Sequence, residues 1–200
     1  VPPEETPLPY QLRQSNGLTL AAAVNAWGPA KITLDHLADD LESTRAGIEK
    51  ALAESDLVIL SGGISKGKKD YVRPALESLI GPPIFHGVAQ RPGKPFAFWQ
   101  GVAALPGNPN STLTTFQRYL VPLLNKMVGT GSPPPTNLSL ASPIKQHPKL
   151  TQFLAAKFTA DGKAQALSPQ NSGDFLTAMS GTGYLEIPPG EGTIKTALFR

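Results

Sequence analysis

Apolar and polar positions in the first part of the chain alternate between helix-like and strand-like patterns. Residues 15–28 carry alanines and leucines between a Ser-Asn start and a Gly-Pro end, which predicts a helix capped by its first polar residues. A short strand is expected at 30–34. A second helix is expected at 35–54, beginning at Asp35 and placing its leucines and one isoleucine on a recurring face. The continuous apolar run at 56–60 is typical of a strand buried on both faces.

The alternation continues toward the middle of the chain. A helix is predicted at 71–80, with Pro74 in its first turn, where proline is tolerated. Two or three short strands are expected next, within 84–88, 96–99 and 102–105.

A long helix is expected to follow these strands. It should begin at Asn110 or Ser111 and end at Met127, with a kink at Pro122. Because strands and helices alternate up to this point, we predict an α/β fold with a parallel sheet and helices on both faces.

The hydrophobic period changes after a stretch rich in proline and glycine at 129–136, which is typical of a short linker. Beyond it lie six short strand-like segments, among them FLTAM at 175–179, separated by Asp-Gly, Pro and Gly. We therefore predict an α/β domain at 1–128, with a truncated start, and a small all-β domain at 137–200.

Composition narrows the possible functions. With 200 residues and a hydrophobic content of 40%, the chain can bury a core. It has no cysteine, which excludes disulfides, thiolate metal sites and a cysteine nucleophile. A net charge of +3 without a long basic tract gives no indication of a nucleic-acid surface. The apolar stretch at 18–27 is too short to span a membrane, and we expect no membrane association.

Three glycine-containing loops follow predicted strands, at 61–70, 90–95 and 105–111. In an open α/β sheet, ligands bind outside the carboxyl ends of the strands. Glycine allows sharp turns and close approach to a ligand, and backbone N–H groups in such turns bind anions. The charged residues in these loops that bear on binding are Lys66, Arg91, Lys94 and Asp70.

These features predict a phosphate-bearing or oxyanion ligand, with Asp70 able to hold a hard cation such as Mg²⁺. The first loop lacks the P-loop spacing, so we do not expect a Walker-type nucleotide site. The sequence offers no His–Asp pair that would activate Ser61 as a nucleophile, which argues against nucleophilic catalysis. On composition alone, three ordinary surface turns with solvated lysines remain an alternative.

Several segments closely resemble one known family. LSGGISKGKKDYV at 60–72, RPGKPFAF at 91–98 and ALPGNPNSTLTTF at 104–116 resemble the signature loops of the MoeA/gephyrin family, the molybdopterin molybdenumtransferases. RQSNGLTLAAAV at 13–24 is similar to a helix of that family, and NSGDFLTAM at 171–179 to its C-terminal domain. The resemblance covers nearly the whole chain and identifies it as the C-terminal portion, lacking the N-terminal domains.

The resemblance implies a three-layer α/β/α molybdenum cofactor-binding domain, like that of MoaB and Mog proteins, followed by a small β-barrel-like domain. It implies molybdenum cofactor biosynthesis, in which adenylated molybdopterin and molybdate give the molybdenum cofactor and AMP with the help of Mg²⁺. It also implies a cytoplasmic homodimer, with the pterin as small-molecule partner and the molybdopterin adenylyltransferase as protein partner.

The resemblance also assigns individual residues. Asp70 is expected to contact Mg²⁺ or to orient water, and Lys94 and Arg91 are expected to be catalytic. An arginine expected before the TQF segment is Leu150 in this chain, which departs from the family pattern. The residues expected to bind the phosphate, pterin or molybdate are Ser61, Gly62, Gly63, Ser65, Gly67, Pro106, Gly107, Asn108, Pro109, Ser111 and Ser172.

Two alternatives remain open. One is a relative with the same fold, either an adenylyltransferase or a CinA-like nucleotide hydrolase, although the β module and the PGKP loop argue against both. The other is a non-enzymatic, gephyrin-like scaffold. The resemblance implies that part of the family's acidic cluster, which belongs to its active site, precedes the segment that begins here at Val1. We therefore expect this chain to fold and bind ligands but to insert little molybdenum alone.

Overall fold

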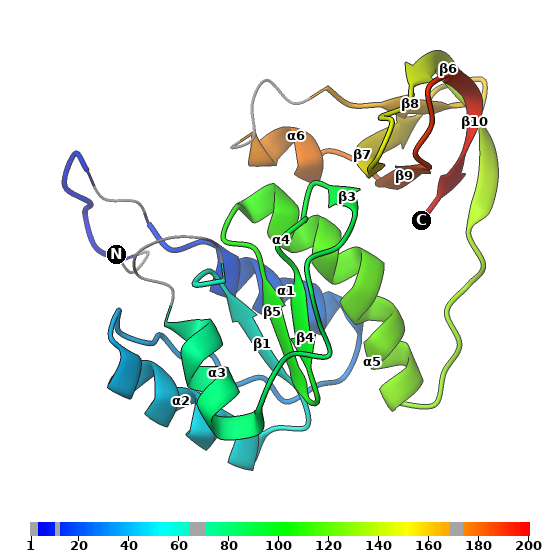
Figure 1. The fold of residues 1–200 in the computed structure, drawn as a ribbon. Helices are drawn as coiled ribbons and strands as arrows, with labels where there is room; N and C mark the ends of the chain where they lie inside the picture. Colours follow the sequence, from blue (N-terminus) through cyan, green and yellow to red (C-terminus); the bar gives the residue numbers. More distant parts are fainter. Residues whose placement is uncertain (1–3, 11–12, 65–70, 169–173) are drawn as a thin grey trace. The chain divides into compact units, whose positions relative to one another are not determined.

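The contacts within the chain separate two compact units, which we describe one at a time (Figure 1). The computed structural model describes residues 4–10, 13–64, 71–168 and 174–200. The first unit consists of Val1–His86 and Ala97–Leu113, and the second of Gly87–Phe96 and Thr114–Arg200. The domain boundaries predicted from the linker composition stay a prediction. Among the described helices, none is both long and apolar enough to span a bilayer.

The first unit contains a four-stranded mixed sheet in the order β1-β5-β4-β2. Strands β1 and β5 are parallel, whereas β4 is antiparallel to both β5 and β2. The prediction of a parallel sheet was therefore wrong for β4, because the tight turn at Gly101 (φ +78°) between β4 and β5 allows only antiparallel pairing. The strands are β1 (Val58–Ser61), β2 (Phe85–His86), β4 (Ala97–Trp99) and β5 (Val102–Leu105).

Helices cover both faces of this sheet. Helices α2 (Leu41–Glu54) and α3 (Val72–Ile80) pack on one face, where they share a core with Trp99 and Val102. Because side chains alternate along a strand, Ser61 lies on the opposite face, toward α1 (Asn16–Trp27). This order of layers confirms the predicted α/β/α fold.

Helix α2 begins later than the sequence pattern predicted. Asp40, not Asp35, caps it by accepting a hydrogen bond of 2.8 Å from the backbone N–H of Ser43. That bond is the main reason why the pKa of the Asp40 carboxyl is lowered. Leu37 precedes the helix and packs against Gly47, where no room is left for a Cβ atom.

The strand expected at 30–34 does not form. The side chain of Leu34 lies against Gly17 instead, so close that a Cβ atom on Gly17 would be 2.9 Å from a Leu34 methyl carbon. This segment therefore packs along α1 and does not join the sheet.

The second unit contains a closed ring of five strands. Strand β7 pairs with both β8 and β9, which closes the order β7-β8-β6-β10-β9 into a barrel around a small apolar core. This confirms the predicted barrel-like domain. The short strand β3 (Gln90–Arg91) pairs with the start of β7. The five barrel strands are β6 (Thr136–Lys145), β7 (Thr151–Phe158), β8 (Ala164–Ala166), β9 (Gly183–Ile187) and β10 (Thr193–Phe199).

One segment predicted as a strand is the short helix α6 (Phe175–Met179). Asp174 caps it, because its carboxylate accepts hydrogen bonds from the backbone N–H of Thr177 at 3.1 Å and from the Thr177 hydroxyl at 2.7 Å. The prediction was wrong because the Asp-x-x-Thr capping pattern outweighs the strand-like composition of these few residues.

The predicted long helix is present, but its middle is not α-helical. The backbone N–H of Val121 bonds to the carbonyl oxygen of Phe116, which is π-helical spacing. Pro122 follows directly and lies in the first turn of the next α-helical segment, where its missing N–H is tolerated. The three consecutive segments are α4 (Pro109–Thr115), the π-helix η1 (Phe116–Leu120) and α5 (Val121–Met127).

Candidate functional site

Two glycine turns meet at the carboxyl ends of β1 and β5. Because these strands are parallel and Ser61 is in register with Leu105, the turns that follow them leave the same edge of the sheet. Gly62 and Gly63 have φ angles of +88° and +68°, which favour glycine. A Cβ atom on Gly107 would lie 3.5 Å from the Cα atom of Gly62, so the two turns touch each other's backbone.

Asn16 connects both turns to α1. Its side-chain amide donates hydrogen bonds of 2.9 Å to Ser61 Oγ and of 2.8 Å to the carbonyl oxygen of Gly107. The sequence suggested that Ser15 or Asn16 caps the helix, but no side-chain capping bond is formed at Ser15. Asn16 instead fixes the relative position of two loops that are distant in the sequence.

The buried hydroxyl of Thr112 also contacts both turns. Its side chain is 1% exposed, and its hydroxyl lies 2.5 Å from the carbonyl oxygen of Pro106 and 3.0 Å from that of Asn108. The hydroxyl also lies 3.5 Å from Ser61 Oγ. The turn at 106–108 is therefore held from both sides.

Asn108 caps the helix that follows this turn. Its side-chain oxygen accepts hydrogen bonds from the backbone N–H of Ser111 at 3.1 Å and from the Ser111 hydroxyl at 3.3 Å. The prediction that Asn110 or Ser111 caps the helix was wrong, because the helix begins at Pro109. Proline suits that first position, since it has no backbone N–H and the N–H of another residue would have no partner within the helix there.

The structure thus brings two of the three predicted loops together through hydroxyl, amide and carbonyl groups. In the described part of these loops no side chain carries a charge, so the groups that they offer are hydroxyls, amides and backbone N–H and C=O groups. The predicted binding residues that it gathers at this edge are Ser61, Gly62, Gly63, Pro106, Gly107, Asn108, Pro109 and Ser111.

Five residues that the sequence singled out for binding lie outside the described residues. They are Ser65, Lys66, Gly67, Asp70 and Ser172. Within the ranges that are described, no group of three His, Cys, Asp or Glu residues could hold a metal ion. The magnesium contact assigned to Asp70 therefore stays a prediction.

The third predicted loop, at 90–95, belongs to the second unit and has a buried side and an exposed side. Gln90 is only 2% exposed and Gly93 is buried, whereas the side chains of Arg91 and Lys94 are exposed. The Arg91–Pro92 peptide bond is cis. Among the described residues, neither cation has an ion-pair partner. The loop therefore presents two positive charges outward.

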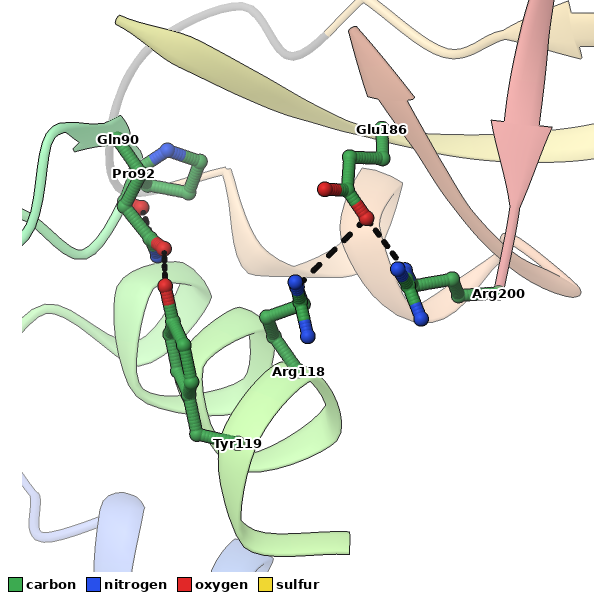
Figure 2. A network of polar contacts seen from close by, with 6 residues as sticks. All are labelled: Gln90, Pro92, Arg118, Tyr119, Glu186 and Arg200. Carbon is green, nitrogen blue, oxygen red and sulfur yellow. Dashed lines mark hydrogen bonds and ion pairs between the residues drawn. The ribbon is translucent and has the colours of Figure 1, made fainter. Parts of the chain in front are cut away.

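Gln90 holds the backbone of this loop (Figure 2). Its side-chain nitrogen donates a hydrogen bond of 2.8 Å to the carbonyl oxygen of Pro92, and its side-chain oxygen accepts one of 2.5 Å from the Tyr119 hydroxyl. Gly93, on the buried side of the loop, has a φ angle of +95° and lies close to Thr115. A Cβ atom at this position would be 2.6 Å from the Thr115 hydroxyl oxygen. A larger residue could not occupy position 93 without moving the loop.

The residue next to Tyr119 forms a second polar network. Arg118 Nε lies 3.6 Å from Glu186 Oε2, and Arg200 also donates a hydrogen bond to that oxygen (Figure 2). The Arg118 guanidinium carbon lies 5.3 Å from the centre of the Tyr119 ring. Burial raises the pKa of Tyr119, the Arg118 charge opposes this rise, and the Glu186 charge adds to it. Tyr119 therefore stays a hydrogen-bond donor at neutral pH.

Sequence reasoning missed four residues that shape these loops, namely Asn16, Thr112, Gln90 and Tyr119. Each lies in a segment that was quoted for another feature, a helix cap, a signature loop or a long helix. Their partners are distant in the sequence, so no local pattern indicated the contacts.

Comparisons with known proteins agree with this geometry. Residues 5–126 match the model of a family described as a probable molybdopterin binding domain. The chain is 35% identical over 194 residues to the molybdopterin molybdenumtransferase of Synechocystis sp., a match covering 92% of this chain and 47% of that protein. It is 30% identical to the enzyme of the same name from Staphylococcus epidermidis, covering 91% and 45%.

A solved structure extends the comparison to the whole chain. The crystal structure of the molybdopterin biosynthesis moea protein from Pyrococcus horikosii superimposes with a TM-score of 0.81 at 30% identity, covering 100% of this chain and 51% of that one. The chain therefore spans about half the length of the relatives it matches.

Proposed function

The chain belongs to the family of the probable molybdopterin binding domain, and from this premise we propose that it carries the pterin-binding part of a molybdopterin molybdenumtransferase. In the proposed reaction, molybdate is inserted into adenylated molybdopterin and AMP is released. The observation that carries the proposal is the hydrogen-bonded network of Asn16, Ser61 and Gly107, which fixes two glycine turns at the ends of parallel strands.

This network suits a flat, phosphorylated ligand. Ligands of open α/β sheets bind at the carboxyl ends of the strands, where these turns lie. A Cβ atom on Gly62 would meet nothing within 4 Å, so glycine there lets a ligand approach the backbone closely, whereas glycine at 63 and 107 leaves room for Val72 and for the backbone of Gly62. The Ser61 hydroxyl and the backbone groups supply hydrogen bonds for the pterin and its phosphate, and we propose the same role for Ser65, Gly67 and Ser172.

The second substrate, molybdate, is a small tetrahedral dianion, for which we propose Arg91 and Lys94 as contacts. Both side chains are exposed, and neither has an ion-pair partner among the described residues. Charge-assisted hydrogen bonds from arginine and lysine are the strong contacts for such anions. In this role the two cations bind the oxyanion and balance its charge.

Magnesium has less support in the part of the chain that the structure describes. A magnesium ion prefers carboxylate oxygens, and no group of acidic or histidine side chains able to hold a metal is present there. The described residues do not fit the ion by themselves, so we assign no reaction step to it. The proposal of a magnesium contact rests on Asp70, with substrate phosphates completing the coordination.

We also propose a cytoplasmic homodimer that receives its substrate from the molybdopterin adenylyltransferase. An adenylated substrate has to come from a reaction that transfers an adenylyl group, so an enzyme of that class is the expected supplier. The two predicted domains, 1–128 and 137–200, remain part of this proposal.

The match over both predicted domains favours the transferase over the alternatives. An adenylyltransferase or a CinA-like hydrolase was expected to resemble the first domain only. The Synechocystis and Staphylococcus relatives instead match 92% and 91% of the chain, which includes the barrel. No observation in the described residues favours a scaffold function.

A binding experiment and a graft test the proposal. Adenylated molybdopterin should bind the 200-residue chain, and Ser61→Ala should weaken binding. Residues of this chain should also replace the matching 47% of the Synechocystis enzyme and support molybdate-dependent AMP release. If the folded chain binds no pterin, and the folded graft releases no AMP, the proposal is wrong.

A further inference from the structure

We propose that Gln90 and Tyr119 are positioning residues, which hold the backbone at 91–94 so that Arg91 and Lys94 present their charges to a tetrahedral oxyanion. This inference rests on the proposed function, because molybdate is the dianion that these cations would bind. It deepens that function by naming residues that never touch the anion but set where its ligands lie.

The first step is the division of the loop into two sides. Gln90 and Gly93 are buried beneath the loop, and the exposed cations Arg91 and Lys94 alternate with them. The two charged residues therefore share one short backbone segment, and the position of that backbone decides where both charges lie. Whatever holds the buried side sets the geometry of the exposed side.

The second step is the relay that holds the buried side. The Tyr119 hydroxyl donates to the Gln90 side-chain oxygen at 2.5 Å, and the Gln90 nitrogen donates to the carbonyl oxygen of Pro92 at 2.8 Å. Pro92 lies between the two cations in the chain. Because Gln90 is 2% exposed, water cannot readily replace a partner that is removed.

The third step is the rigidity of the donor. The Tyr119 ring stacks on Phe96 with centroids 5.0 Å apart and 24° between the planes, and the Arg118 guanidinium lies on the ring. Arg118 and Tyr119 are neighbours in η1. Tyr119 contacts Gln90, and Arg118 contacts Glu186. A side chain fixed on two sides can define the position of its hydroxyl closely.

The backbone of the loop offers a readout that needs no ligand. The N–H of Val88 bonds to the carbonyl oxygen of Lys94 at 2.9 Å, and the N–H of Phe96 bonds to that of Gly93 at 3.2 Å. Hydrogen exchange at these two amides therefore reports whether the loop keeps its conformation.

The test uses Tyr119→Phe, which keeps the ring and removes the donor. Sodium molybdate, with sulfate as a second tetrahedral dianion, is titrated calorimetrically into the 200-residue chain. We expect Tyr119→Phe to weaken molybdate binding about five- to tenfold, to leave pterin binding unchanged and to speed exchange at Val88 and Phe96. Gln90→Met should have the same effects. The double variant should lose no more molybdate affinity than the single variant with the larger loss, since both residues act through one relay.

Tyr184→Phe is the matched control. Tyr184 is another partly buried tyrosine of the second unit, and its side chain is hydrogen-bonded to Thr114, which lies outside the loop. This control should lower the melting temperature without changing molybdate binding or exchange at Val88 and Phe96. An equal loss of binding in Tyr184→Phe would mean that the effect is general destabilisation, and would overturn the inference.

Failure of the inference and failure of the proposed function are distinguishable. If the wild-type chain binds neither dianion, the oxyanion part of the proposed function is wrong, and exchange alone then decides the role of Tyr119. Unchanged exchange at Val88 and Phe96 in both Tyr119→Phe and Gln90→Met would overturn the inference, whatever the binding result.

Discussion

The side-chain amide of Asn16 donates a hydrogen bond of 2.8 Å to the carbonyl oxygen of Gly107, which lies 91 residues later in the chain. The same nitrogen reaches Ser61, so one side chain at the start of α1 links the two turns that end β1 and β5. Asn16 therefore sets, together with Thr112, the spacing of the surface that we propose for the pterin.

Replacing Asn16 by alanine should weaken pterin binding more than it weakens the fold. Two hydrogen bonds at a partly exposed position are lost, which we expect to cost about 1–2 kcal/mol, or roughly tenfold in affinity. Asn25→Ala on the exposed side of the same helix is the matched control and should change affinity little. Equal pterin affinity in the two variants, measured by fluorescence titration, would contradict the role assigned to Asn16.

The two glycines after β1 should differ in their tolerance of alanine. Both have positive φ angles, so each change should cost about 1–2 kcal/mol of stability. At Gly63 the new Cβ atom would also lie 2.6 Å from a Val72 methyl carbon, whereas at Gly62 it would meet nothing within 4 Å. Denaturant unfolding should therefore rank Gly63→Ala below Gly62→Ala, and Gly131→Ala, which lacks both problems, close to wild type.

Lys94→Ala should weaken oxyanion binding about ten- to hundredfold at low ionic strength, because a charge-assisted hydrogen bond is lost. The difference in oxyanion affinity between the variant and the wild type should shrink as salt is added, because salt screens the attraction between Lys94 and the oxyanion, which only the wild type has. Lys195→Ala removes the same charge from an exposed position on β10 and serves as the control. A loss of similar size in both variants would show that net charge, not the loop, attracts the anion.

The turn between β7 and β8 should show a defined acid dependence. Hydrogen bonds from Lys163 and then Thr159 lower the pKa of the exposed Asp161 carboxyl to about 2, from 3.8. A lowered folded-state pKa means that the carboxylate stabilises the fold above about pH 4 and that this contribution is lost as the pH falls toward 2. Asp161→Asn should therefore lower the melting temperature at pH 7 but not at pH 2, and NMR should show Asp161 titrating near pH 2.

Asp70 provides a test of the magnesium proposal. In the graft on the Synechocystis enzyme, Asp70→Asn should lower the rate of AMP release and its dependence on magnesium concentration. Pterin affinity should change little, because the amide keeps the size of the side chain and the glycine turns remain. A variant with wild-type turnover would remove Asp70 from the reaction.

The sequence indicated most strands and most helices because their signals are local. The apolar runs that became β1 and β5 and the glycines that follow them were recognised directly, and so was the positive charge of Arg91 and Lys94. The cap at Asp174 was also local, but five residues carry too little periodicity to separate a helix from a strand. The contacts of Asn16 with Gly107 and of Gln90 with Tyr119 depend on tertiary packing, which no spacing in a single sequence encodes.

The closed ring of strands in the second unit has a further consequence for how the protein behaves at high concentration. In an open sheet, the outer strands leave N–H and C=O groups that can pair with another molecule. Here β7 pairs with both β8 and β9, so within the described ring no strand is left as an outer one. The pairing of Ala155 with Tyr184 is part of this closure. If β7 and β9 separated there, both strands would expose unpaired backbone N–H and C=O groups. Such a change would show itself first as aggregation during expression, before any ligand had been offered.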